Sequence, residues 1–187
     1  YQTATVCVPP CYVERIASQP GDKPAICTVI GFPLGYDTTA AKVEAAKTAI
    51  AQGASEIDMV VNLADVKNGD FAAVTREIAA VKGAIDRHIL KVIVETCYLT
   101  REEKIALCRC VTEGGADFIK TSTGFGTGGA TLEDIRLFRE HIGPGVQMKA
   151  AGGIRTLEDM EAYLREGCAR IGTSSAVKIL TESLRQS

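Results

Sequence analysis

Short apolar segments alternate with longer amphipathic segments along the whole chain. The apolar segments are three to seven residues long and rich in β-branched residues, which predicts strands. Seven strands are expected, at Ala4–Val8, Ala25–Ile30, Glu56–Asn62, Leu90–Glu95, Phe118–Lys120, Val146–Lys149 and Ala169–Gly172. The sequence between them therefore has to supply the connections from each strand to the next.

Each expected strand is followed by a segment with helical spacing of apolar residues. Helices are expected at Cys11–Ser18, from Thr38 or Thr39 to about Gln52, at Phe71–Ile85, from Thr100 onward, at Leu132–His141, at Thr156–Glu166 and from Ser174 to the end. Asp70 and Thr131 stand where helix N-caps are expected, and Thr100 with Glu103 has the spacing of a capping box.

This alternation predicts an α/β fold with a parallel sheet, because a helical crossover returns the chain to the same end of the sheet. The nearly continuous apolar strands indicate a sheet that is covered on both faces. We expect a TIM (β/α)8-type barrel in which residues 1–187 form one domain with seven of the eight β/α units. An open doubly wound sheet is the alternative, but no Gly-x-Gly-x-x-Gly follows the first strand.

Composition narrows the classes of function. The net charge is −2, and no basic stripe with aromatic residues predicts a nucleic-acid partner. No apolar run is long enough for a membrane span. Seven scattered cysteines favour a reduced, cytoplasmic protein. Two histidines cannot build a zinc site of several histidines, so we expect chemistry without a metal or a cofactor.

Two lysines stand at the ends of expected strands and lead into glycine-bearing loops. They are Lys120 and Lys149. Burial disfavours an ammonium ion and can turn a lysine into a nucleophile. A lysine at a strand end can instead reach water, and Lys149 can alternatively bind a phosphate. Two such lysines in equivalent places favour the chemical interpretation.

Asp58 lies inside an apolar strand and is expected to be buried or to face inward. A carboxylate between two lysines can transfer protons, or it can serve as their structural partner. Two lysines and one carboxylate suit Schiff-base formation followed by proton transfer to an enamine. Other strand-end side chains would share the same mouth of a barrel, namely Cys7, Asn62, Glu95, Thr96 and Ser174.

The last two loops carry the signature of a phosphate site. Ala151–Arg155 contains Gly152 and Gly153, and the loop after the seventh strand begins at Gly172. Backbone N–H groups at glycine turns and helix N-termini bind phosphate, and barrel enzymes often place phosphate at the loops after their final strands.

Several segments together resemble the deoxyribose-phosphate aldolase family, whose members are class I, Schiff-base aldolases. The resemblance covers nearly the whole chain and is carried by residues 6–8, 29–35, 56–58, 91–96, 118–124, 149–155 and 170–174. It implies reversible cleavage of 2-deoxy-D-ribose 5-phosphate to acetaldehyde and D-glyceraldehyde 3-phosphate. It also implies a cytoplasmic homo-oligomer, dimer or tetramer, that needs no cofactor and whose partners are phosphosugars and aldehydes.

By the same resemblance, Lys120 forms the Schiff base, while Asp58 and Lys149 act as proton donor and acceptor. Cys7 is expected near the aldehyde pocket. The residues expected at the substrate or its phosphate are Thr123, Gly124, Gly152, Gly153, Gly172, Ser174 and Ser175.

The chain departs from the family pattern in two ways. Phe125 stands where some members carry a lysine at the phosphate, and the family's first strand and helix are absent. We therefore expect a gap between the first and last strands, with exposed edges. A truncated, non-catalytic phosphosugar-binding barrel is one alternative function. A related Schiff-base aldolase of different specificity, such as a transaldolase-like enzyme, is the other.

Overall fold

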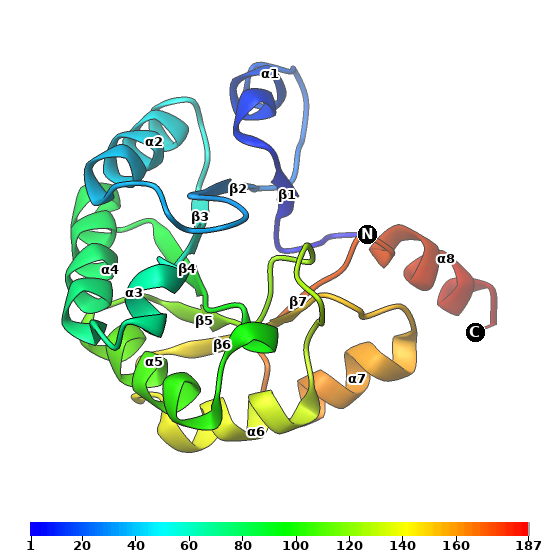
Figure 1. Ribbon diagram of the computed structural model, residues 1–187. Helices are drawn as coiled ribbons and strands as arrows, with labels where there is room; N and C mark the ends of the chain where they lie inside the picture. The colour runs from blue at the N-terminus through cyan, green and yellow to red at the C-terminus, as the bar shows by residue number, and fades with distance from the viewer. Residues whose placement is uncertain (187) are drawn as a thin grey trace.

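The computed structural model describes residues 1–186 as one curved parallel sheet with helices around its outside (Figure 1). The strands follow the chain in the order β1 to β7, and every neighbouring pair is parallel. Their bounds are β1 Val6–Val8, β2 Ile26–Ile30, β3 Glu56–Val60, β4 Ile89–Ile93, β5 Phe118–Lys120, β6 Gln147–Ala151 and β7 Arg170–Gly172. This confirms the expected α/β, barrel-type architecture.

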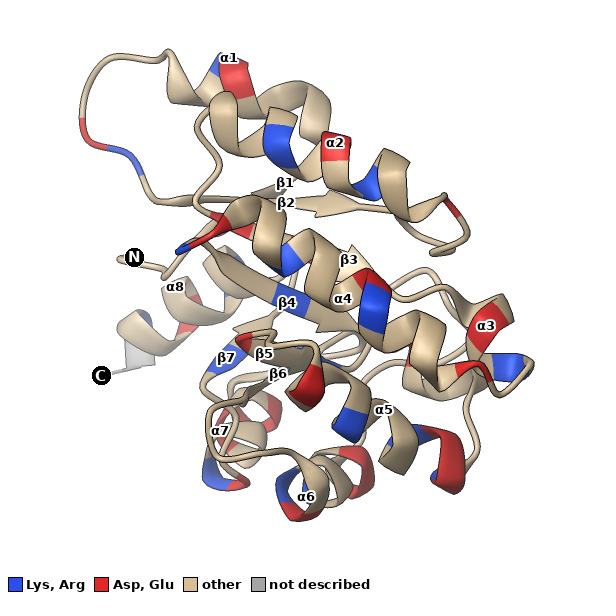
Figure 2. Ribbon diagram, turned by 90° about the vertical axis from the view of Figure 1, so that its left-hand side faces the viewer, with Lys and Arg blue, Asp and Glu red and all other residues tan. Residues whose placement is uncertain are grey.

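The helices form the outer layer in Figure 1. Their bounds are α1 Val13–Ala17, α2 Thr39–Ala51, α3 Leu63–Lys67, α4 Phe71–Ile85, α5 Arg101–Glu113, α6 Leu132–His141, α7 Leu157–Arg165 and α8 Ala176–Gln186, with short 3₁₀ turns η1 at Pro10–Tyr12 and η2 at Thr96–Tyr98. Figure 2 shows residues of both charge signs spread over the outer helices. Within residues 1–186, no helix is both long and apolar enough to cross a membrane.

Side-chain caps begin the helices where the sequence predicts them. Asp70 accepts the N–H of Ala73 at 2.9 Å and opens α4. Thr100 and Glu103 form the expected capping box of α5. Thr38, Thr131 and Thr156 cap α2, α6 and α7 in the same way. Each cap satisfies an amide that the first helical turn leaves without an intrahelical partner.

Alternation along the strands separates the apolar core from a polar interior. Ile57 and Met59 of β3 pack into the main hydrophobic cluster between the sheet and the helices, whereas Asp58 lies between them in sequence and points to the other face. One charged pair also lies in the outer layer, where Lys42 Nζ contacts Glu77 Oε2 at 2.8 Å and joins α2 to α4.

Two strands end earlier than expected. β3 stops at Val60, because the side chain of Asn62 accepts the N–H of Ala64 at 3.1 Å and begins the unforeseen helix α3. β4 stops at Ile93, and Glu95 adopts a left-handed backbone conformation with φ of 56° before the turn η2. β6 instead extends to Ala151, two residues beyond its expected end.

The sheet does not close on itself within residues 1–186. β1 and β7 lie at its two edges and do not pair with each other, as the sequence predicts. The hydroxyl of Tyr1 contacts Thr181 of α8, so the N-terminal residues lie beside the last helix.

Candidate active site

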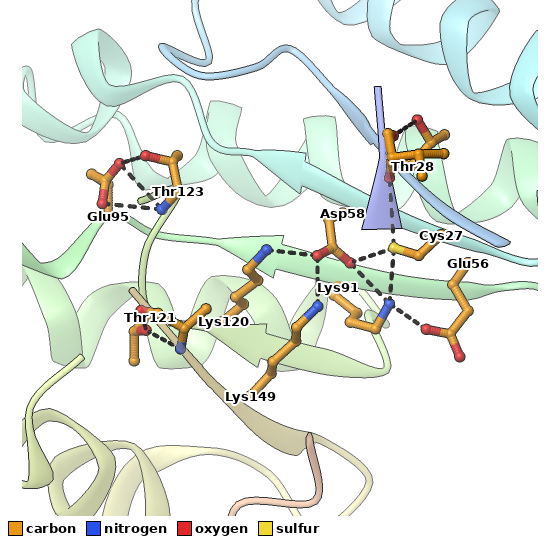
Figure 3. Close-up of polar contacts among 12 residues, drawn as sticks. Cys27, Thr28, Glu56, Asp58, Lys91, Glu95, Lys120, Thr121, Thr123 and Lys149 are labelled. Atoms are coloured by element: carbon orange, nitrogen blue, oxygen red, sulfur yellow. Dashed lines mark hydrogen bonds and ion pairs between the residues drawn. The ribbon is translucent and has the colours of Figure 1, made fainter. Parts of the chain in front are cut away.

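Asp58 is the centre of the polar interior (Figure 3). It is fully buried, and its Oδ2 accepts hydrogen bonds from Lys120 Nζ at 2.7 Å and from Lys149 Nζ at 2.9 Å. The three residues that the sequence singles out for catalysis therefore meet in one place, although they lie on β3, β5 and β6.

The strand register explains this convergence. Lys120 of β5 pairs directly with Lys149 of β6, and directly paired residues of parallel strands point to the same face. Both ammonium groups consequently lean toward the carboxylate of β3 from neighbouring strands. Each lysine retains only slight exposure, 6% for both residues.

Lys91 is a third lysine at this carboxylate, and sequence reasoning did not single it out. It pairs with Asp58 across β3 and β4, and its Nζ contacts Asp58 Oδ1 at 2.9 Å and Glu56 Oε2 at 2.5 Å. Arg170 of β7 faces the other oxygen of Glu56 at 3.6 Å. A signal was present in the sequence: Lys91 interrupts an apolar strand, and Glu56 precedes Asp58 by the two-residue strand period.

The charges of this cluster act strongly on Asp58. Burial alone would raise the pKa of its carboxyl, but the ammonium groups of Lys120, Lys149 and Lys91 together lower that pKa well below its usual range. Asp58 is therefore a carboxylate throughout the neutral range. The three lysines outnumber the two carboxylates, Asp58 and Glu56, and this excess of positive charge attracts an anion.

Two thiols complete the cluster on its β1 and β2 side. Cys27 Sγ lies 3.3 Å from Asp58 Oδ1 and 3.5 Å from Lys91 Nζ. Cys7 is exposed, and its sulfur, that of Cys27 and an oxygen of Asp58 lie within 4.8 Å of one another. These three atoms could hold a metal ion, but the ammonium groups around Asp58 repel a cation, and we assign no metal centre to them.

Glu95 organises the loop that follows Lys120. Thr123 donates its hydroxyl to Glu95 Oε2, and its backbone N–H lies 3.2 Å from Glu95 Oε1. Among the described residues, the hydroxyls of Ser122 and Thr96 in this region are buried and have no hydrogen-bond partner. Thr123 thus holds the loop through Glu95, a contact that its sequence position did not reveal.

The predicted phosphate residues lie at the same end of the strands, in loops or, for Gly172, at the last residue of β7. Gly124, Gly152 and Gly153 have positive φ values of 89°, 88° and 78°, a backbone conformation that favours glycine. A Cβ at Gly172 would lie 3.2 Å from the Cε of Lys149, which places this glycine against the catalytic candidate.

The loops after β6 and β7 are joined to each other near these glycines. Thr173 donates its hydroxyl to the carbonyl of Ile154 at 2.7 Å and accepts the N–H of Ser175 at 3.0 Å. Ser174 is exposed, just before the start of α8. The Ser175 amide is used within the loop, whereas a Cβ at Gly153 or Gly124 would meet no atom within 4 Å, so these two glycines border open space.

Comparison with known proteins adds an independent finding. A model described as "DeoC/LacD family aldolase" matches residues 2–179. A deoxyribose-phosphate aldolase of Clostridium botulinum (strain Eklund 17B / Type B) is 61% identical over 180 residues, which cover 96% of this chain and 81% of that protein. The solved structure of an aldolase named QR15 superposes with a TM-score of 0.93 at 42% identity, covering 98% of this chain and 82% of the other.

A third relative is a deoxyribose phosphate aldolase from Aeropyrum pernix whose structure is described as a unique tetramer. It is 31% identical with a TM-score of 0.82, and the match covers 97% of this chain and 77% of that one.

Proposed function

This chain belongs to the DeoC/LacD family of aldolases, and from that premise we propose that it cleaves 2-deoxy-D-ribose 5-phosphate reversibly to acetaldehyde and D-glyceraldehyde 3-phosphate. The observation that carries the proposal is the convergence of Lys120 and Lys149 on one oxygen of Asp58. The 61% identity to a deoxyribose-phosphate aldolase supports this activity over the binding-only and transaldolase-like alternatives.

Lys120 supplies the nucleophile in this proposal. Its neutral amine attacks the open-chain aldehyde of the substrate, and the carbinolamine loses water to form an imine. The protonated imine accepts the electron pair released when the C2–C3 bond breaks and the C3 hydroxyl loses its proton. D-Glyceraldehyde 3-phosphate leaves, and an enamine of acetaldehyde stays on Lys120. Protonation of the enamine carbon and hydrolysis of the imine release acetaldehyde and restore the amine.

Lys149 and Asp58 divide the proton transfers according to their charges. Because the pKa of Asp58 is held low, this residue stays a carboxylate, a weak base that orients both lysines and takes a proton only in transit from one group to another. The ammonium group of Lys149 shares Asp58 Oδ2 with Lys120, so it is placed to donate a proton beside the reacting amine. Cys7 lies beside this pair, in line with the proposed aldehyde pocket.

The phosphate is proposed to lie at the glycine loops after β5, β6 and β7. The support is that Gly124 and Gly153 border open space, while Gly172 lies against Lys149. Backbone N–H groups of these loops, of Gly152 and of Ser174 would face the phosphate, with Thr123 and Ser175 shaping the loop walls. The excess of positive charge in the cluster favours an anionic substrate at this end.

We further propose a cytoplasmic homo-oligomer, either a dimer or a tetramer. All seven cysteines are free, in line with a reducing compartment. The tetramer described for the Aeropyrum pernix relative, which is 31% identical, supports self-association of this chain.

Trapping with acetaldehyde and sodium borohydride tests the assignment directly. Reduction should attach a two-carbon group to Lys120 and leave Lys149 and Lys91 unmodified, because only the nucleophile forms the imine. Peptide mass spectrometry locates the label. Lys120→Ala should lose both the label and the cleavage of 2-deoxyribose 5-phosphate. Lys47→Ala, which removes an exposed lysine paired with Glu44 on the outer helix α2, should keep both.

A label found on Lys149 or Lys91 instead of Lys120 would contradict the assignment. A folded protein that binds the phosphosugar but neither cleaves it nor traps acetaldehyde would favour the binding-only alternative.

A further inference from the structure

Two cysteines face each other inside the polar interior, beside the catalytic candidates. Cys7 of β1 and Cys27 of β2 are direct partners in the parallel register, so their side chains leave the sheet on the same face. Neighbouring strands lie about 4.8 Å apart, a spacing within the range of Cα separations of about 4.4–6.8 Å found in disulfides. The two sulfur atoms lie within 4.8 Å of each other, and side-chain rotation with a slight approach of the strands would join them.

The two thiols differ in the way that an attacking and a resolving cysteine differ. The pKa of Cys7 is lowered to about 7, chiefly because the Cys27 thiol donates a hydrogen bond to its sulfur. Burial and Asp58 oppose this shift, whereas the ammonium groups of Lys120 and Lys149 reinforce it. Cys7 is exposed and partly thiolate at neutral pH, the form that reacts with oxidants.

Cys27 stays a thiol. The same hydrogen bond to Cys7, together with burial and the charge of Asp58, raises the pKa of Cys27. Its proton can be donated to the Cys7 sulfur or to Asp58 Oδ1, 3.3 Å away. A reactive, accessible thiolate next to a protected thiol is the arrangement of a redox-sensitive pair.

We propose that Cys7 and Cys27 form a modification site for hydroperoxides, which convert the pair into a reversible disulfide. The Cys7 thiolate attacks the terminal peroxide oxygen, the O–O bond breaks, and Cys7 becomes a sulfenic acid while the leaving hydroxide or alkoxide takes a proton to give water or an alcohol. The Cys27 sulfur then attacks the Cys7 sulfur. The S–S bond forms, and the displaced hydroxide leaves as water with the Cys27 proton. The two thiols lose two electrons, and the peroxide gains them.

The disulfide acts on the catalytic cluster through Asp58. Bridging removes the Cys27 thiol proton that faces Asp58 Oδ1 and moves the sulfur that Lys91 contacts. Asp58 in turn holds Lys120 and Lys149, so its displacement moves the reacting groups. A shift of about 1 Å at reacting groups can cost about 100-fold in rate. This consequence rests on the proposed aldolase function, whereas the disulfide itself does not.

The remaining cysteines provide internal comparisons. Burial raises the pKa of Cys108, Cys110 and Cys168, which are therefore poor nucleophiles. Cys11 is exposed and lies in η1, four residues beyond Cys7, so it is the competing partner for Cys7.

The experiment treats the reduced protein with hydrogen peroxide at neutral pH. Peptide mass spectrometry under non-reducing conditions should show a Cys7–Cys27 bridge, and dithiothreitol should remove it, because a bridge between paired strands is strained and easily reduced. Cleavage of 2-deoxyribose 5-phosphate should fall by about 100-fold in the bridged fraction and should return with the thiols. The mass measurement does not depend on activity. An absent Cys7–Cys27 disulfide can therefore be distinguished from an absent aldolase activity.

Two serine variants test which cysteines form the disulfide. Cys27→Ser keeps a hydroxyl donor beside Cys7 but cannot form the bridge. Peroxide should therefore leave Cys7 as a sulfenic acid, which dimedone labels. This sulfenic acid should proceed to a sulfinic acid, which dithiothreitol does not reverse. Cys11→Ser should form the bridge and keep the activity of the reduced protein. A Cys7–Cys11 bridge, sulfinic acid at Cys7 of the unmodified chain, or no reaction at Cys7 would each overturn the proposal.

Discussion

Asp58 holds three ammonium groups that are almost fully buried. Its side chain is fully buried, and its two oxygens contact Lys120, Lys149 and Lys91 at 2.7–2.9 Å. A buried charge is tolerated only when it is paired, so each lysine depends on this carboxylate. The residue thus has a structural role and a chemical role at once, the two interpretations that its sequence position leaves open.

Asp58→Asn should destabilise the protein by about 3–5 kcal/mol at neutral pH, because it leaves buried ammonium groups without their counter-charge. Urea denaturation of both proteins measures the difference. Glu140→Gln, at an exposed carboxylate that has no ion pair within residues 1–186, should change stability by less than about 0.5 kcal/mol. An Asn variant as stable as the parent would show that the lysines do not need Asp58 in the fold.

The pH dependence of this effect follows from the lowered pKa of Asp58. A carboxyl whose folded pKa is depressed contributes stability above its unfolded pKa of about 3.9 and loses it as the pH falls through the folded value. The difference between the parent and Asp58→Asn should therefore be full at neutral pH and disappear only in strongly acidic solution.

At the scale of elements, the start of each helix sets the position of the loop before it. The capping box of α5 fixes Thr100 through two hydrogen bonds, and Glu103 of the same box also binds Lys67 of α3 at 2.7 Å. These contacts hold two segments at the ends of β3 and β4, the strands that carry Asp58 and Lys91.

Thr100→Ala should lower the free energy of unfolding by about 1 kcal/mol, because the N–H of Glu103 loses its acceptor. Chemical denaturation measures the change. Thr48→Ala is the matched control, since Thr48 is exposed in the last turn of α2 and makes no side-chain hydrogen bond within residues 1–186. Alanine should leave stability there unchanged or raise it slightly. If both substitutions changed the free energy of unfolding equally, loss of the cap would not explain the effect of Thr100→Ala.

At the scale of the whole molecule, the open sheet is the main feature. β1 and β7 each have a strand on one side only within residues 1–186. Edge strands present backbone N–H and C=O groups that can pair with another chain. The sheet edges are thus surfaces through which copies of this chain can associate.

We expect copies of this chain to associate with one another as the protein concentration rises. This association should slow hydrogen exchange at the two sheet edges. Sedimentation velocity should show larger species at higher concentration, and hydrogen–deuterium exchange should slow in β1 and β7 as they form. The amides of α4, on the outer layer, serve as the comparison and should exchange at an unchanged rate. A single monomeric species at all concentrations, or protection confined to the helices, would show that the edges do not drive association.

The sequence by itself determined the order of the strands and of every helix except α3, the parallel sheet and the three central residues of the site. Local chemistry explains why: the cap at Asp70 and the strand ending in Lys120 are set by neighbouring residues, and helical crossovers force parallel strands. Where a local hydrogen bond competed with an apolar run, as at Asn62, the predicted strand end was wrong.

Only the tertiary structure decided which side chains meet. The contacts of Asp58 with Lys91, Lys120 and Lys149 join residues 33 to 91 positions apart in the chain. They depend on the register between β3, β4, β5 and β6, and a shift of one residue would turn each side chain to the opposite face. The pairing of Cys7 with Cys27 has the same origin, because two cysteines in separate apolar strands carry no sequence signal of their register.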